Sequence, residues 1–137
     1  MKRLDLQALF NAMFDETAPG WPVVTVDVDG VLNLYTGWTG KVETFTVAPG
    51  AREFLEELRH RFKTIVAYTA TLPLEVVEDW LKEVELADLI DFLCSKPLAC
   101  CYIDDRGIQH RGDFNETLAA VDRFVPHWQA VKENETN

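Results

Sequence analysis

The chain has 137 residues, of which 47% are hydrophobic and 26% charged, and its formal net charge is −10 at pH 7. A chain of this length and composition can bury a core as one globular domain, which excludes a disordered chain or a fibre. The excess of acidic residues argues against general affinity for nucleic acids or anionic membranes, because little cationic surface is present to displace counterions.

Two features bear on where the protein is located. No apolar run approaches the roughly 20 residues needed to span a bilayer, and polar residues interrupt the N-terminal stretch before it can serve as the apolar part of a signal peptide. The cysteines, Cys94, Cys100 and Cys101, are odd in number and lack C-x-x-C spacing, which is typical of interior thiols in a cytoplasmic protein. We therefore expect a cytoplasmic protein with no membrane association.

The first third of the chain predicts a helix, a strand and a flap. Apolar side chains recur near helical spacing over residues 4–14, which predicts an amphipathic leader helix. A β-branched run at residues 22–28 is typical of a buried strand. Aromatic and polar residues alternate over residues 33–46, which indicates a short β-hairpin flap.

Helices and strands continue to alternate through the rest of the chain. The expected elements are a helix at 49–62 with Pro49 at its first position, a strand at 64–68, a helix at 73–86, strands at 89–94 and 99–103, and a last helix that begins at Asp113. This order predicts an α/β fold, a Rossmann-like three-layer sandwich with a mostly parallel central sheet. We expect a single domain over residues 1–137, with a leader at 1–20, a core at 22–125 and a flexible tail at 130–137.

Polar residues lie at the predicted strand ends, where ligands bind in parallel sheets. The first strand ends in Asp27 and Asp29, whose side chains would point to one side, roughly 6–7 Å apart, if the strand continues. Gly30 permits the sharp exit that follows them. The second strand ends in Thr69 and the last strand in Asp104 and Asp105, and Lys96 lies just before that last strand.

One lysine cannot balance four carboxylates at one edge of a sheet. Two like charges about 4 Å apart repel by roughly 4 kcal/mol at an effective dielectric constant near 20. Either some carboxylates are protonated, or a divalent cation lies among them. Clustered carboxylates without a nearby histidine favour Mg²⁺ over zinc. The sequence therefore predicts a magnesium site that is suited to holding a phosphate oxygen.

Each of these motifs taken alone also has a structural explanation. A D-x-D-G tetrapeptide is commonly a turn, and Thr69 or Thr71 could cap the helix that follows. Lys-Pro and Asp-Asp pairs are common in solvated loops. The complete set, with each member at a predicted strand end, favours a functional site.

The ordered set resembles the motifs of the haloacid dehalogenase superfamily of aspartate-nucleophile phosphohydrolases. The first motif is matched by VTVDVDGVL at 24–32 and the second by IVAYTA at 65–70. Lys96-Pro97 looks like the third motif and YIDDR at 102–106 like the fourth. The resemblance covers residues 22–124, and it is specific to the superfamily rather than to a substrate.

The resemblance implies a Mg²⁺-dependent phosphomonoester hydrolase with an aspartyl-phosphate intermediate on Asp27. Asp29 would be the general acid and base, which protonates the leaving oxygen and then activates water. Thr69, with Ala70 beside it, would bind a phosphoryl oxygen. Lys96 would neutralise charge on the nucleophile and the phosphate.

The resemblance also implies the metal ligands and the absence of a cap domain. Asp27, the main-chain carbonyl of Asp29, Asp104 and Asp105 would hold Mg²⁺, and which of the last two binds it directly stays open. Relatives commonly insert a cap after the first motif or between the second and third. Here 16 residues lie between Leu32 and Pro49, and 26 between Thr69 and Lys96, which is too few for a cap.

Capless relatives act on bulky substrates or close an open site by oligomerisation. We expect a phosphorylated small molecule or a phosphoprotein as the substrate, and a homo-oligomer could close the site. The net charge disfavours polynucleotides. Tyr35 and Trp38 of the flap could stack on a substrate ring, or they could pack against the base of the flap or a partner subunit. Thr71 stands where many relatives carry arginine, so a substrate contact at this position is in doubt.

Two other classes of protein use similar residues. A signalling receiver module has an adjacent acidic pair at its first strand and a single acid later, which is the reverse of the order found here. A catalytically silent protein that binds phosphate or another ligand on the same scaffold stays open as an alternative, because an intact set of motifs does not prove turnover.

Overall fold

The computed structural model describes residues 1–17, 20–34, 45–126 and 128–129. These residues fall into two compact units, Met1–Leu98 and Ala99–Asn137. Among the described residues, the first unit contains the sheet and α-helices α1 to α3, and the second contains the helix α4. A single domain over the whole chain therefore stays a prediction.

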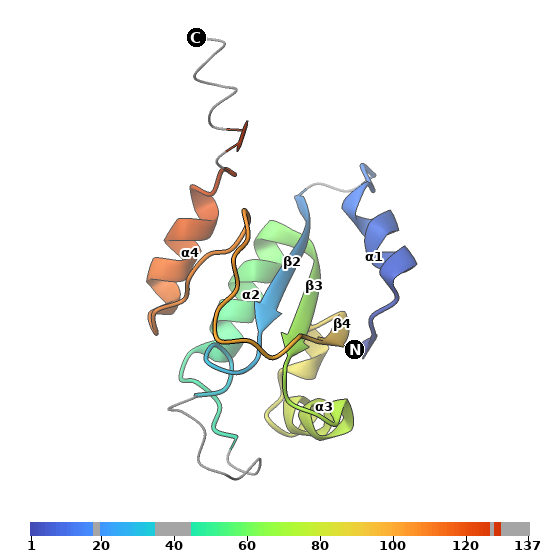
Figure 1. Ribbon diagram of the computed structural model, residues 1–137, viewed down its shortest axis with the longest axis vertical. Coiled ribbons are helices and arrows are strands. Elements are labelled where there is room, and N and C mark those ends of the chain that lie inside the picture. Colours follow the sequence, from blue (N-terminus) through green and yellow to red (C-terminus); the bar gives the residue numbers. More distant parts are fainter. Residues whose placement is uncertain (18–19, 35–44, 127, 130–137) are drawn as a thin grey trace. The chain divides into compact units, whose positions relative to one another are not determined.

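A four-stranded, all-parallel sheet forms the centre of the first unit (Figure 1). The strands lie in the order β1 (Lys2–Arg3), β4 (Phe92–Ser95), β3 (Phe62–Thr69) and β2 (Trp21–Asp27). In β3 the consecutive residues Ile65, Val66 and Ala67 are all fully buried, which is typical of a parallel strand covered on both faces. The predicted α/β fold with a parallel central sheet is confirmed.

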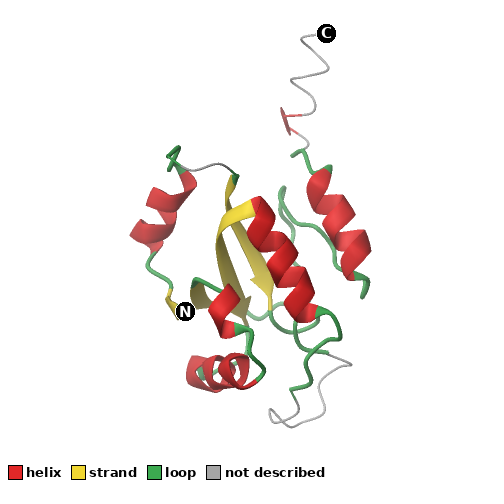
Figure 2. Ribbon diagram, turned by 180° about the vertical axis from the view of Figure 1, so that it is seen from behind, coloured by secondary structure: helices red, strands yellow, loops and turns green. Residues whose placement is uncertain are grey.

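Three helices flank this sheet. They are α1 (Leu6–Met13), α2 (Ala51–Arg61) and α3 (Leu74–Glu83), and a short 3₁₀ helix, Ala87–Leu89, follows α3. In Figure 2 α2 lies in front of the sheet, where it packs against β3. The residues that α2 buries, Ala51, Phe54, Leu55 and Leu58, recur at helical spacing and form much of the core. Burial of each large apolar side chain stabilises the fold by about 1.5–3 kcal/mol.

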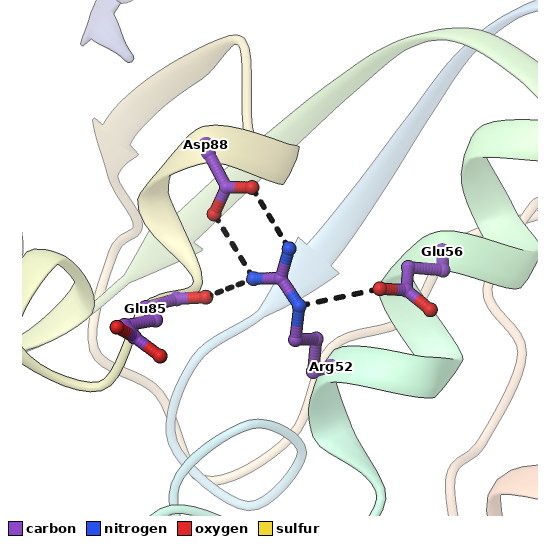
Figure 3. Close-up of polar contacts among 4 residues, drawn as sticks. All are labelled: Arg52, Glu56, Glu85 and Asp88. Atoms are coloured by element: carbon purple, nitrogen blue, oxygen red, sulfur yellow. Dashed lines mark hydrogen bonds and ion pairs between the residues drawn. The ribbon is translucent and has the colours of Figure 1, made fainter.

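An arginine at the start of α2 fixes this helix against the segment that follows α3 (Figure 3). The Arg52 guanidinium donates to both carboxylate oxygens of Asp88, at 3.1 and 2.9 Å, and to the main-chain carbonyl of Glu85, and it pairs with Glu56 at 3.2 Å. The hydrogen bond from Arg52 lowers the pKa of Asp88. Glu85 has a φ of 60°, in the left-handed region, so the bond to its carbonyl supports an unfavourable turn at the end of α3.

The second unit contains the predicted last helix, α4 (Phe114–Asp122). The Asp113 side chain accepts hydrogen bonds from the backbone N–H groups of Asn115 and Glu116, at 2.9 and 3.2 Å, so the expected helix start is confirmed. α4 buries Thr117 and Val121.

The strand predicted at residues 99–103 is wrong, because no strand forms among the described residues of the second unit. Two of its residues are exposed, with Tyr102 at 47% and Ile103 at 97%. A strand needs a neighbouring strand with which to pair, and none is present among the described residues of the second unit. Cys100 and Cys101 are likewise exposed rather than interior, whereas Cys94 in β4 is half-buried.

Two further expectations concern the start of α2 and the predicted flap. Pro49 is not the first residue of α2, because Gly50, with a φ of 86°, precedes the helix and Ala51 begins it. The tip of the predicted flap, residues 35–44, lies outside the described residues. At its base the backbone pairs in antiparallel fashion, with Leu34 N–H bonded to Thr46 O and Ala48 N–H to Leu32 O, each at 2.8 Å.

Within the described part of the chain, no helix is long and apolar enough to cross a bilayer.

Candidate active site

A tight turn at the carboxyl end of β2 positions the first pair of acidic residues. Beyond Asp27, the Val28 N–H still bonds to Tyr68 O at 3.0 Å, so the strand ladder runs one residue further. The Val28 carbonyl then accepts from the N–H groups of Leu32 and Asn33, at 3.0 and 2.8 Å. Gly30, with a φ of 87°, supplies the left-handed residue that this turn requires. Asp29 therefore sits in the turn, directly beyond the end of β2.

The end of β4 brings a cation to Asp27. The Lys96 N–H bonds to Thr69 O at 2.8 Å, which extends the pairing of β4 with β3 and fixes the start of the lysine side chain. The Lys96 ammonium lies 2.9 Å from Asp27 Oδ2 and 4.4 Å from the centre of the Tyr68 ring. The two side chains are only 12% and 27% exposed, so this pair is shielded from solvent far more than a surface ion pair.

The environment of Asp27 disfavours its charged form. Burial raises the pKa of Asp27, the hydrogen bond and charge of Lys96 lower it, and the charge of Asp29 raises it, with a net increase. A carboxyl whose pKa is raised within a partly buried ion pair is typical of functional sites.

Asp29 is held by three hydrogen-bond donors that involve both of its carboxylate oxygens. The hydroxyls of Thr69 and Thr71 donate to Oδ2 at 2.9 and 3.0 Å, and Asn33 Nδ2 donates to Oδ1 at 3.2 Å. The Thr71 N–H bonds in turn to Thr69 Oγ1 at 3.0 Å, and Thr46 N–H bonds to Asn33 Oδ1 at 2.8 Å. The carboxylate is therefore fixed from the ends of β2 and β3 and from the base of the predicted flap.

Asn33 and Thr71 are the two residues of this arrangement that sequence reasoning missed or discounted. Asn33 is buried between Leu32 and Leu34 in an otherwise apolar stretch. A polar residue in such a stretch needs a hydrogen-bond partner when it is buried. The position of Asn33 in the sequence could therefore have indicated that its side chain bonds to another residue. Thr71, expected either to cap the following helix or to stand in place of the arginine of relatives, donates its hydroxyl to Asp29.

The structure brings Asp27, Asp29, Thr69 and Lys96 together, as the strand-end rule predicts. Ala70 lies half-buried, next to Thr69 in the chain.

Asp104 and Asp105 belong to the second unit. Asp104 Oδ1 accepts from the N–H groups of Arg106 and Gly107, and Asp105 Oδ2 accepts from Trp128 Nε1 at 3.0 Å. Arg106 also lies 3.9 Å from Asp105. Convergence of all four carboxylates stays a prediction.

The chemistry of the residues at this site fits magnesium, but the first unit provides only part of a ligand set. Carboxylate and carbonyl oxygens are the donors that Mg²⁺ prefers. Asp27 Oδ2 is already paired with Lys96, and both oxygens of Asp29 accept hydrogen bonds, which leaves the Asp29 main-chain carbonyl as the ligand expected from that residue. Among the described residues, no group of three or more acidic, histidine or cysteine side chains is placed to hold a metal ion.

Comparisons with protein-family models, with curated proteins and with solved structures find no match to this chain.

The raised pKa of Asp27 predicts that Asp27→Asn increases stability at neutral pH. A carboxyl with a raised folded-state pKa contributes stability that is complete below its unfolded pKa and is lost as the pH rises through the folded value. Asparagine has a similar shape and never ionises. In metal-free buffer with a chelator, urea unfolding should show the variant to be more stable than the original chain at pH 7, with a difference that shrinks below about pH 4.

The control for this measurement is Asp79→Asn, which removes the same charge from an exposed position on α3. It should show no comparable gain. A loss of stability in Asp27→Asn that is the same at both pH values contradicts the burial of charge at Asp27.

Proposed function

We propose that the protein is a Mg²⁺-dependent phosphomonoester hydrolase of the haloacid dehalogenase type, with Asp27 as the nucleophile. The observation that carries the proposal is the pairing of Lys96 with Asp27 at 2.9 Å, beside an Asp29 carboxylate that is bonded to Thr69 and Thr71. Two carboxylates at one strand end thus have different surroundings, as two different chemical roles require.

In the proposed first step, an oxygen of Asp27 attacks phosphorus and forms an aspartyl-phosphate, while the bond to the leaving oxygen breaks. Asp29 donates a proton to that oxygen. In the second step Asp29 accepts a proton from water, which attacks phosphorus and releases inorganic phosphate and a free Asp27. Lys96 offsets the negative charge of the nucleophile and of the phosphoryl oxygens in both steps.

The geometry around Asp29 supports this role. Proton transfer depends on a carboxyl group that stays within hydrogen-bond reach of the reacting oxygen. Thr69 and Thr71 hold one oxygen of the group and Asn33 holds the other. In the proposal Thr69 and Ala70 also contact the phosphoryl group, so that segment would position both the acid and the substrate.

Magnesium would be held by Asp27, the Asp29 carbonyl, Asp104 and Asp105, and it would supply positive charge where the phosphoryl oxygens bind. We further propose a phosphorylated small molecule or phosphoprotein as the substrate, with nucleic acid disfavoured by the net charge of −10, and a cytoplasmic location. Stacking of Tyr35 or Trp38 on a substrate stays a prediction, because both lie outside the described residues.

Hydrolysis of an aryl phosphate tests the proposal directly. With millimolar Mg²⁺ we expect release of the phenol, and with excess EDTA we expect the rate to fall by about 100-fold or more, because the charge that holds the phosphoryl group is lost. Added Mg²⁺ should restore the rate. Release that is equally fast in EDTA contradicts the magnesium assignment. The absence of release at high protein concentration contradicts the hydrolase and favours the silent ligand-binding protein.

A further inference from the structure

The first helix carries an exposed apolar surface. Leu6, Phe10, Met13 and Phe14 recur at helical spacing and are 76%, 61%, 37% and 68% exposed. The rings of Phe10 and Phe14 lie 4.9 Å apart. We call these four side chains the α1 stripe.

The rest of α1 has no charged residues, which is unusual for a helix that is exposed on one side. Ala8, Leu9 and Ala12 are half-buried, and α1 packs against β2. The polar side chains of the helix, Gln7 and Asn11, hydrogen-bond to each other at 3.0 Å. No charged residue occurs within Leu6–Met13. A helix whose apolar residues extend around most of its circumference is normally covered, and an exposed apolar patch marks an interaction site.

We propose that the α1 stripe is a homodimer interface, in which it packs antiparallel against the same stripe of a second copy of this chain. A two-fold interface uses one patch twice, so the patch must be complementary to itself. Lys2, Arg3 and Asp5 precede the stripe, whereas Asp15 and Glu16 follow it, with the Lys63 ammonium bonded to the Asp15 carbonyl. The formal charge is therefore positive before the stripe and negative after it. Antiparallel packing brings Lys2 of each copy to the acidic end of the other, and it also opposes the two helix dipoles favourably. Parallel packing would place like charges together.

The size of the stripe is consistent with a weak dimer. Four large side chains with this exposure offer roughly 400 Å² in each copy. With the flanking residues, the interface approaches the roughly 1,000 Å² in total at which specific interfaces begin. We therefore expect a dissociation constant in the micromolar range. An anionic membrane suits the stripe poorly, because such surfaces bind helices rich in lysine and arginine, and the residues Leu6–Met13 include neither.

Sedimentation analysis of the full chain tests the proposal. Protein concentrations up to about 200 µM are high enough to detect a dimer with a micromolar dissociation constant. The chain should form dimers, and Leu6→Gln with Phe10→Gln should weaken association by at least about tenfold. Both side chains are largely exposed, so circular dichroism and thermal melting at low concentration should remain unchanged. The matched control is Val76→Gln, which replaces an exposed apolar residue on α3 and should leave association intact.

Charge exchange tests the antiparallel arrangement separately. Lys2→Glu and Glu16→Lys should each weaken the dimer, and the double variant, which exchanges the charges of the two ends, should recover it. A chain that stays monomeric at the highest concentration overturns the proposal, whether or not it binds anionic vesicles. A dimer whose association is unchanged by the stripe variants also overturns it. So does a double variant that associates more weakly than either single variant.

Discussion

Asp27→Asn is expected to abolish hydrolysis, with a fall in kcat of about 1,000-fold or more. An amide oxygen is a poor nucleophile and cannot form the aspartyl-phosphate, so the proposed first step is lost. Removal of a nucleophile from an otherwise intact site commonly leaves only the residual effect of binding and charge stabilisation. The measurement is steady-state release from an aryl phosphate with millimolar Mg²⁺. A second measurement is acid-quenched trapping of labelled phosphate on the protein, which should appear in the original chain and not in the variant.

Asp79→Asn again serves as the control, since it removes an exposed carboxylate from α3 and should keep the full rate. The variant at Asp27 should also remain folded, because the loss of a partly buried charge favours the folded state at neutral pH. Activity and stability should therefore change in opposite directions at this residue. A normal rate in Asp27→Asn contradicts the assignment of the nucleophile.

The central strand β3 could be predicted because its sequence pattern matches its burial. The Ile65–Ala67 segment of β3 is continuous, apolar and fully buried, as a strand covered on both faces must be. The expected burial of the run that forms β2 is wrong, because β2 lies at the edge of the sheet, with Trp21 and Thr25 exposed and only Val26 of the strand buried. The run at residues 99–103 has a similar composition, and it forms no strand. Composition reports how well a residue suits a sheet, whereas a strand also needs a neighbour with which to pair.

In the candidate site, too, features set by the local sequence pattern could be predicted, whereas contacts with residues elsewhere in the chain could not. Asp27, Thr69 and Lys96 were predictable because the ends of parallel strands meet at one edge of a sheet. The partners of Asp29 were harder to predict, since the bond from Thr71 depends on the path of the chain after β3 and that from Asn33 on a turn of four residues. Neither feature has a periodicity that a sequence pattern would reveal.

Lys96→Met is expected to lower kcat/KM by about 100-fold and to change its pH dependence. Methionine keeps an unbranched apolar stem but removes the ammonium that lies 2.9 Å from Asp27. The loss of this charge weakens stabilisation of the phosphoryl oxygens and of the ionised nucleophile. The matched control is Lys82→Met, because Lys82 is 59% exposed and pairs with Glu78 at the surface of α3. Its rate should stay close to that of the original chain.

The direction of the pH change follows from the environment of Asp27. Burial already raises the pKa of this carboxyl, and Lys96 lowers it more than any other neighbour does. Without Lys96 the pKa rises further, so a smaller fraction of Asp27 is ionised at any given pH. Because only the carboxylate attacks phosphorus, the acidic limb of the kcat/KM profile should move to higher pH in Lys96→Met and stay in place in Lys82→Met. A profile that keeps its shape while the rate falls would mean that Lys96 acts on the substrate alone, and the proposed support of the nucleophile by Lys96 would then be wrong.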